Sequence, residues 1–445
     1  MNKYISVLVI LWLALPCQPK AQDTMPSVLP VKWRLEDCIA YAKRKNITIA
    51  SLRLSTISTQ EDLLQARAAV LPNLNGSASQ NLVNGKNGGS GAGGVQTQSN
   101  FSSSYGVNSS MIIYNGSYLR NDIRVKELSV QSANLTVKET ENDITLSIAQ
   151  AFFNILLAKE NITTLTSVLE TSKEQLQQGQ QRFDAGSIAR KDLLQFQSQV
   201  AGDEFNLINA NNTFRLNTVT LKQLLLLPPD YDLQITAPDT IRVREALPSL
   251  PEAQKLAQQE RPEMQNGQLQ VQISEIEIEK ARAAAKPSVS VGAGLATGYS
   301  DNQSAKYLAQ LDNNFYQTLG VTLGIPIYSR RVNKTNINKS KLLWQQSQLN
   351  LADTRNILNN QVEQAYVNLL NAQERYTAAE TQLRTNEEIY RITNEQLRLG
   401  AVTTVELLLQ KNAYVQALQT FTQAKYNAAL YNKIYQFYMG MPVSF

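Results

Sequence analysis

Side chains that commonly do chemistry are scarce in this chain of 445 residues. Histidine, the commonest general base and a frequent metal ligand, is absent from the sequence. The two cysteines, Cys17 and Cys38, are too few for a disulfide framework. A Ser-His-Asp triad is therefore excluded and zinc chemistry is disfavoured, so we predict no catalysis, no cofactor and no metal.

Two carboxylates nevertheless occupy matching positions. Asp192 and Glu406 each lie six residues after a glycine, Gly186 and Gly400. Glycine readily adopts the positive φ that a turn between antiparallel helices needs, so each acid is predicted one turn into the helix that follows. Thr403 and Glu406 also fit the capping box, in which both side chains satisfy the first N–H groups of a helix. Capping alone explains Glu406, and any further role depends on what surrounds the turn.

The helices that position these acids are predicted to be long. From Gln364 to Pro442 the chain reads as two helical arms that meet at Gly400, each about 50 Å or longer at ~1.5 Å per residue. Apolar or small residues recur every three or four positions, as in a helix that packs along its whole length on neighbours. In the first arm these residues are Ala365, Leu369, Ala372, Tyr376, Ala379, Leu383, Tyr390 and Leu397. The aromatic end of the second arm favours helix packing over a ligand site; its residues are Tyr426, Tyr431, Tyr435, Phe437 and Tyr438.

The same hairpin occurs earlier in the chain at a constant offset of 214 residues, which takes Gly400 to Gly186 and Pro442 to Pro228. An offset that does not drift over this length indicates a duplication. Upstream, Ala66-Arg67-Ala68-Ala69 reappears as Ala281-Arg282-Ala283-Ala284 at an offset of 215. Nearly the whole mature chain is therefore predicted to be two copies of one unit.

Composition narrows the class of protein. Charged residues make up 18 % and hydrophobic residues 43 % of the chain, as in an ordinary folded protein. The formal net charge of +5 is small for this length, and the basic residues are interspersed with acidic ones. We therefore predict no nucleic-acid partner.

The first residues have the order of a secretory signal peptide. Lys3 precedes an apolar run from Ile5 to Leu15 and a polar stretch that ends at Ala21-Gln22, which predicts a signal peptide over 1–21. Lipidation at Cys17 is an alternative, although Pro16 does not fit a lipidation motif. After cleavage Cys38 remains, and we expect it to be buried on a helix face. No other apolar run is long enough to cross a membrane as a helix.

Each copy contains two segments in which apolar and small or polar residues alternate. The predicted strands span about 73–83 and 99–114 in the first copy and about 288–299 and 315–328 in the second. Leu319, Val321 and Leu323, for example, alternate with Thr318, Gly320 and Thr322. Strands of ~10 residues with one apolar face are typical of outer-membrane barrels. An edge hairpin of a soluble sheet is the alternative, but the chain offers no sheet for it to join.

Four strands cannot close a barrel in lipid, because an open sheet leaves two edges of unpaired N–H and C=O groups. Known barrels need ~8 strands or more, so several copies of the chain must contribute strands to one barrel. Two copies supply eight strands and three supply twelve. A cylinder of helices continuous with such a barrel would also cover the apolar stripes of the long helices. The sequence thus predicts a duct.

The duplicated order of helix, two strands and long helical hairpin resembles the TolC-type outer-membrane efflux family. The resemblance covers roughly residues 33 to 442. It is carried by Leu35-Glu36-Asp37-Cys38-Ile39, by Ala66 to Pro72, by Tyr328, and by the turns Arg182-Phe183-Asp184-Ala185-Gly186 and Leu397-Arg398-Leu399-Gly400. It implies a fold that is mainly α with membrane β-strands, a trimer in which an α-helical barrel continues into a twelve-stranded β-barrel. It also implies an outer-membrane location with the helical tunnel in the periplasm.

The resemblance assigns roles to the hairpin tips. It implies that Ala185, Gly186, Ser187, Leu399, Gly400 and Ala401 face a periplasmic adaptor protein, which links the duct to an inner-membrane transporter. It also implies that Glu406, with Asp192 as its equivalent, narrows the channel entrance and favours cations. Some relatives carry a second acid one turn later, where this chain has Leu409. An acidic double ring is therefore not expected.

The predicted organisation is a signal peptide at 1–21, a first repeat at 22–227, a linker or equatorial segment at 228–250 that lies outside the helices, and a second repeat at 251–445. The predicted function is the outer-membrane exit duct of a tripartite efflux system, a homotrimer in contact with outer-membrane lipid. Two alternatives remain at this stage. One is a duct for type I protein secretion, and the other is a periplasmic coiled-coil scaffold without a pore.

Overall fold

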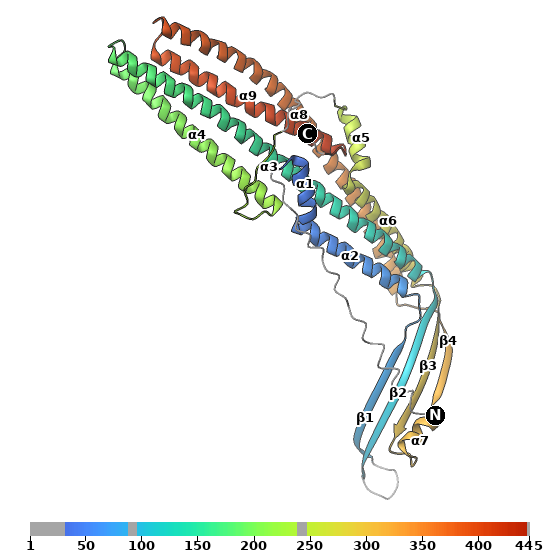
Figure 1. Ribbon diagram of the computed structural model, residues 1–445. Coiled ribbons are helices and arrows are strands. Elements are labelled where there is room, and N and C mark those ends of the chain that lie inside the picture. The colour runs from blue at the N-terminus through green and yellow to red at the C-terminus, as the bar shows by residue number, and fades with distance from the viewer. Residues whose placement is uncertain (1–31, 88–95, 238–246, 443–445) are drawn as a thin grey trace.

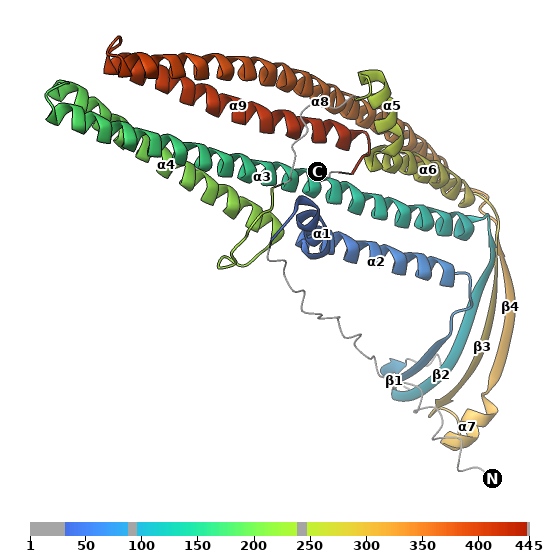
Figure 2. The same ribbon diagram turned by 45° about the horizontal axis from the view of Figure 1, so that its top comes forward.

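The computed structural model describes residues 32–87, 96–237 and 247–442 (Figure 1). The predicted signal peptide and Cys17 lie outside the described residues. Long helices form one end of an elongated molecule and a curved sheet forms the other, in both views (Figure 2). The predicted fold class, mainly helical with a duplicated helix–strand–strand–hairpin unit, is confirmed.

The two copies repeat the same elements in the same order. The first copy contains α1 (Leu35–Lys45), α2 (Ile47–Ala68), β1 (Asn75–Asn87), β2 (Gln96–Asn115), α3 (Tyr118–Asp184) and α4 (Arg190–Leu225). The second contains α5 (Leu250–Glu260), α6 (Pro262–Ala283), β3 (Ser288–Ser300), the short α7 (Tyr307–Asn313), β4 (Tyr316–Gly324), α8 (Val332–Arg398) and α9 (Thr404–Tyr438).

Matching helices have nearly the same length. Helices α3 and α8 both contain 67 residues, α2 and α6 both contain 22, and α1 and α5 both contain 11. At 1.5 Å per residue α3 and α8 are each about 100 Å long, twice the minimum expected from sequence. The apolar stripe of α8 was recognised only from Gln364 because most side chains of its first half are exposed. Helix α8 therefore begins well before the apolar stripe from which the arm was predicted.

Both hairpins end in the same backbone motif. At the end of α3, Gly186 has φ +70°, its N–H donates to Phe183 O and the Ser187 N–H donates to Arg182 O. The end of α8 repeats this at Gly400, with φ +75°, where the Ala401 N–H donates to Gln396 O. This is the Schellman arrangement, which satisfies the last carbonyls of a helix and needs a residue in the left-handed region. Glycine supplies that conformation without strain.

The four strands form one antiparallel sheet in the order β1-β2-β3-β4. Residues paired directly across strands lie on the same face. Val289 pairs with Leu323 and Val291 with Val321, whereas Ser290 pairs with Thr322 and Gly292 with Gly320. The sheet therefore has one apolar face and one face of small or polar residues. Within the described residues β1 and β4 each pair on one side only, so both edges of the sheet are open.

The strands differ from the predicted spans at their ends. Strand β1 continues to Asn87, beyond its predicted end at residue 83, and β4 stops at Gly324 although the apolar alternation continues to Ile327. Pro326 lacks the N–H that a strand needs, which is consistent with the end of β4. The connection between β3 and β4 contains α7, which sequence periodicity did not predict because it has only seven residues.

The main core lies where the two copies meet in the middle of the molecule. Trp33 and Leu35 are fully buried there with Phe152 of α3 and Leu221 of α4. The segment after α4, predicted to be a linker outside the helices, packs two apolar side chains into this core. Leu233 and Ile235 are buried, and Ile235 forms a parallel bridge with Trp33. Its two buried apolar side chains thus cover Trp33 beside α1.

The thiol of Cys38 lies in this core, fully buried as the sequence predicted. Burial, reinforced by the charge of Asp37, raises the pKa of the thiol to about 12. Thiolate is the reactive form, so the native protein should resist alkylation. We expect iodoacetamide at pH 8 to label Cys38 at least ~100-fold more slowly in native than in urea-unfolded protein, as measured by mass spectrometry. Equal rates in the two states would contradict the burial.

Candidate functional site

The candidate site is the end of the molecule opposite the sheet, where the tips of the two hairpins lie (Figure 1). All six residues predicted to dock a partner are exposed, and Leu399 is 82 % exposed. A Cβ atom added to Gly186 or Gly400 would have no neighbour within 4 Å. The six are Ala185, Gly186, Ser187, Leu399, Gly400 and Ala401. The tips therefore present free backbone and small side chains, a surface that another protein can approach closely.

The two predicted entrance acids are held differently. Asp192 is partly buried, and its carboxylate accepts a hydrogen bond of 3.3 Å from the Ala189 N–H at the start of α4. Glu406 is exposed; its own N–H donates to the Thr403 hydroxyl at 3.3 Å. Within the part of the chain that the structure describes, no bond returns from the Glu406 carboxylate to Thr403. Asp192 thus acts as a cap, whereas only half of the predicted capping box forms at Glu406 and its carboxylate is free to face solvent.

Close packing joins the two arms of the first hairpin near its tip. Gly179 on α3 is buried, and a Cβ atom there would lie 2.8 Å from the ring of Phe196 on α4. Glycine is required at this position because the ring occupies the space of a side chain. The equivalent pair in the second hairpin is Thr393 and Gln410, so the second tip has no matching ring contact. The two tips are thus built differently although their turns are alike.

A buried network of charged and polar side chains lies a few turns from the tips. Lys411 of α9 is 2 % exposed and Asp203 of α4 is 4 % exposed, with 3.7 Å between Lys411 Nζ and Asp203 Oδ2. Lys411 Nζ also donates to the Ser172 hydroxyl and, at 3.2 Å, to Gln175 Oε1, both on α3. Three acceptors therefore surround the buried ammonium.

The network extends to all four long helices. The Ser172 hydroxyl donates to the Asp203 carboxylate, and Gln199 Nε2 donates to Asp203 Oδ1 at 3.0 Å. Gln175 Nε2 donates to the Tyr390 hydroxyl of α8 at 3.0 Å. Burial lowers the pKa of the Lys411 ammonium, and the nearby Asp203 carboxylate opposes this effect. The pair and its polar neighbours thus link the two hairpins of one chain.

Sequence reasoning missed this network, although a signal for it existed. Lys411 interrupts the apolar stripe of α9 between Leu407 and Tyr414, and Asp203 interrupts that of α4 between Val200 and Leu207. A charged residue on such a stripe must find a partner when it is buried. The repeat offered a second signal, because residues 197 and 417, the equivalents of Lys411 and Asp203, are Gln and Ala. Which charges pair cannot be read from one sequence.

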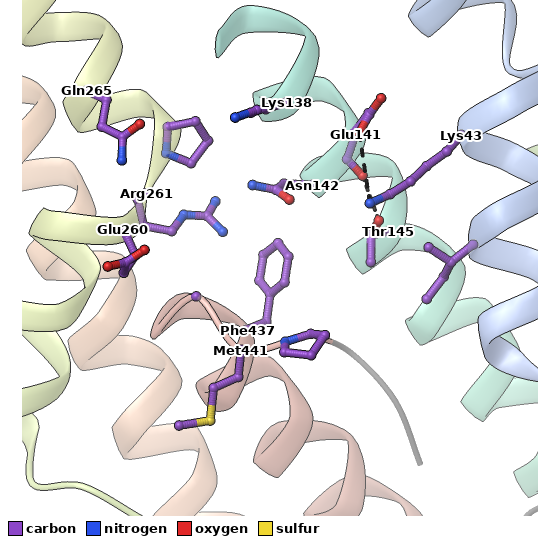
Figure 3. A pocket seen from close by; sticks show the side chains of 14 residues that line it. Lys43, Lys138, Glu141, Asn142, Thr145, Glu260, Arg261, Gln265, Phe437 and Met441 are labelled. Atoms are coloured by element: carbon purple, nitrogen blue, oxygen red, sulfur yellow. Dashed lines mark hydrogen bonds and ion pairs between the residues drawn. The ribbon is translucent and has the colours of Figure 1, made fainter. Parts of the chain in front are cut away.

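A pocket of about 500 Å³ lies midway along the molecule, where α1, α3, α5, α6 and the end of α9 meet (Figure 3). At one side Lys43 and Glu141 face each other at 3.9 Å. Arg261, 3 % exposed, binds Glu263 at 2.6 Å and stacks over the Phe437 ring at 4.6 Å. Burial raises the pKa of the nearby Glu139 carboxyl. The buried cation of this pocket, Arg261, is already paired with Glu263 and is not available to a ligand. We therefore assign the pocket a structural role at the junction of the two copies.

The described residues offer little for metal binding or membrane crossing by helices. No group of three or more His, Cys, Asp or Glu side chains in 32–87, 96–237 and 247–442 could hold a metal ion. Within the same ranges, none of the helices is long and apolar enough to cross a membrane. The aromatic residues near the C-terminus pack as predicted: Tyr426, Tyr435 and Phe437 are buried in the cores.

A family model described as outer membrane efflux protein matches residues 39–225 and 254–432 of the chain. The two matched ranges correspond to the two copies of the repeat. No curated protein sequence matches the chain.

Several solved structures share the fold. The chain superposes on CusC, described with its transmembrane channel formation, with a TM-score of 0.80 at 17 % identity, covering 93 % of this chain and 94 % of that one. The CmeC outer membrane channel of Campylobacter jejuni gives 0.74 at 18 % identity, covering 91 % and 85 %. The open state of the MtrE outer membrane channel of Neisseria gonorrhoeae gives 0.76 at 18 % identity, covering 92 % and 90 %. At these identities the likeness shows the fold.

The buried pair of Lys411 and Asp203 predicts how the unfolding free energies of single and double variants should rank. Lys411→Met leaves the Asp203 charge buried without its cation, which should cost about 3–5 kcal/mol of unfolding free energy. The double variant Lys411→Met/Asp203→Leu removes both charges and should return to within ~1 kcal/mol of the original chain or exceed it. Urea unfolding in detergent, followed by helical circular dichroism, measures both.

A matched control is Lys425→Met, which breaks the partly exposed pair that Lys425 of the same helix α9 forms with Glu160 of α3. Its cost should stay below ~1 kcal/mol because solvent screens that pair. If the double variant is as unstable as Lys411→Met, the two side chains are not coupled as the distances indicate.

Proposed function

The chain belongs to the outer membrane efflux protein family, and on that premise we propose that it is the exit duct of a tripartite efflux system, assembled as a homotrimer in the outer membrane. Members of this family are channels rather than enzymes. The observation that carries the proposal is the four-stranded sheet with one apolar face and two open edges, joined to helices about 100 Å long.

The open edges require further copies of the chain. Strands β1 and β4 would each leave a row of unpaired N–H and C=O groups in lipid, which is too costly to persist. Pairing β4 of one copy with β1 of the next satisfies both edges, and three copies give twelve strands.

The exposed apolar face argues against a scaffold without a pore. Leu319, Val321 and Leu323 are 81 %, 71 % and 60 % exposed, and they all lie on one face of β4. Large apolar patches of this kind mark contact with protein or lipid. Lipid is the contact that fits strands with a small or polar opposite face. A duct for secreted polypeptides would share this architecture, and the attached transporter would decide between the two cargoes.

The hairpin tips are the proposed docking surface for a periplasmic adaptor protein. Their exposed small residues, Ala185, Gly186, Ser187, Gly400 and Ala401, allow close approach of another backbone, and Leu399 offers an apolar contact. The adaptor in turn would connect the duct to an inner-membrane transporter, which supplies energy and selects cargo. The sheet then lies at the outer-membrane end and the tips at the periplasmic end.

At the tips we propose that Glu406 acts on ions that enter the duct and that Asp192 serves chiefly as a helix cap. The Glu406 carboxylate is exposed and without a bond to the helix N-terminus among the described residues, so three copies would place three free charges around the entrance. Such a ring attracts cations and repels anions. The Asp192 carboxylate is engaged by the Ala189 N–H.

The first experiment measures assembly and conduction on the mature protein extracted from membranes in detergent. Light scattering should give about three times the mass of one chain, and planar bilayers should show single-channel currents. Glu406→Gln should lower the cation-over-anion permeability ratio roughly twofold, read from the reversal potential in a salt gradient. Asp192→Asn is the matched control and should change the ratio little while lowering thermal stability by ~1 kcal/mol.

Each outcome decides something different. A conducting trimer whose permeability ratio does not change in Glu406→Gln would support the duct and contradict a role of Glu406 in ion selectivity. A soluble monomer without conductance would overturn the duct itself.

A further inference from the structure

A second pocket, of about 480 Å³, lies at the junction between the sheet and the helices. It is formed by the start of α3, the end of α6, the start of β3 and the segment after β4. The residues that matter to its chemistry are Asn115, Tyr118, Lys286, Ser288, Ile325 and Pro326. One chain supplies the whole set. The lining combines an ammonium, an amide and a hydroxyl with apolar walls, which is the composition of a ligand site rather than of a packing defect.

The strand register places this pocket on the small, polar face of the sheet. Ser288 pairs directly with Gly324 on one side and with Asn115 on the other, so all three lie on one face. That face carries the glycines, serines and threonines of β3 and β4. A register shift between Ile112 and Tyr114 brings Asn115 to it. In a membrane barrel the polar face lines the interior, so the pocket opens toward the lumen of the proposed duct.

Lys286 is the charged group of this pocket, and its ammonium has no acidic partner among the described residues. The neighbouring cations of α6 differ: Lys280 binds Asp122 at 2.9 Å and Glu277 at 2.8 Å, and Arg282 binds Glu279 at 2.5 Å. The acids near the junction on α6 and α3 are therefore engaged elsewhere. A lysine that is left without a carboxylate beside a pocket is available to an anion from outside the chain.

The turn before α3 holds the stem of Lys286. Gly116 has φ +65°, and a Cβ atom added there would lie 2.8 Å from Lys286 Cβ and 2.8 Å from Ala283 O. The lysine stem thus occupies the space that a side chain at 116 would need. Lys286 is exposed overall, so its stem lies against this turn while its ammonium can reach solvent and the pocket.

Comparison of the two copies shows that the positive charge is particular to the second. At the repeat offset, Leu71 is the counterpart of Lys286, and Gly116 and Ser117 are the counterparts of Arg330 and Arg331. All four turn residues have positive φ, from 47° to 74°. Arginine is unfavourable in that region and glycine is not. The second copy therefore carries three added cations at this junction, two of them at a conformational cost, which raises the local positive potential.

We propose that Lys286 and its pocket form an anion-binding site inside the duct, one per protomer, for amphiphilic molecules that carry a carboxylate, sulfonate or phosphate group. The ammonium of Lys286 binds the anionic group, while Tyr118, Ile325 and Pro326 contact the apolar body. The inference rests on the proposed function, because it needs a duct. Binding must be weak and reversible, since a conducting path requires that what enters also leaves.

The test uses block of single-channel current by naphthalene-2-sulfonate, with neutral 2-naphthol as the uncharged probe. We expect the sulfonate to block the channel and the naphthol to block far less. Lys286→Gln should raise the half-blocking sulfonate concentration about tenfold, and Lys286→Arg should keep it near the original value. Lys45→Gln, an exposed lysine at the end of α1, is the matched control and should leave block unchanged.

If Lys286→Gln assembles poorly, a cysteine variant allows the charge at this position to be changed after assembly. In Lys286→Cys channels, reaction with an aminoethyl methanethiosulfonate restores a positive charge, and a sulfonatoethyl reagent installs a negative one. The first should restore sulfonate block and the second should abolish it within a single recorded channel. Buried Cys38 should not react with these reagents. Treatment of the unsubstituted protein with the same reagents is the control for this.

The outcomes separate this inference from the proposed function. A chain that forms no channel overturns the duct, and with it the premise of the site. If the trimer conducts but the sulfonate blocks Lys286→Gln channels as strongly as unmodified ones, the anion site is contradicted and the duct is supported. The same conclusion follows if naphthol blocks as well as the sulfonate.

Discussion

The constraint on which this architecture depends is that backbone hydrogen bonds must be completed at the edges of the sheet. Every strand of the four has a partner, but β1 and β4 have one each, and no other element of the described chain covers their free sides. In lipid such an edge is intolerable, so the fold of one chain is incomplete by construction. The same holds for the helices, whose length exceeds what a single chain can cover. Under the proposed function, further copies of the chain would complete both the sheet and the helical packing.

Two kinds of contact join the copies of the repeat within the chain, and they have different energetics. In the middle of the molecule the contact is apolar, where Leu430 and Phe437 of the second copy are buried in one cluster with Phe152 of the first. Toward the tips it is the ion pair of Lys411 and Asp203, set in hydrogen bonds from all four long helices. Apolar packing tolerates small shifts, whereas a buried pair has one satisfied geometry. The hairpins are therefore fixed against each other most specifically near the end where the proposed partners dock.

Charge is distributed unevenly along the proposed duct. The exposed carboxylate of Glu406 lies at one end, and the unpaired ammonium of Lys286 lies about the length of a long helix away, where the helices meet the sheet. Between them, most charged groups that are buried have partners, as Arg261 and Lys411 do. Unpaired charges at the entrance and at the barrel would act on ions at separate points of the path.

The sequence by itself determined the repeat, the hairpin turns at Gly186 and Gly400, the two faces of the strands and the need for several copies, because these depend on local periodicity and on backbone chemistry. It also placed Cys38 in the core. It could not determine the full length of α8, whose exposed half has no apolar stripe, or the seven-residue α7. Tertiary structure alone decided that Lys411 pairs with Asp203. Among the described residues it also left Glu406 and Lys286 without a charged partner, whereas Asp192 is engaged. Those properties depend on which side chains from distant helices approach within a few ångströms, and residue spacing along one chain does not specify that distance.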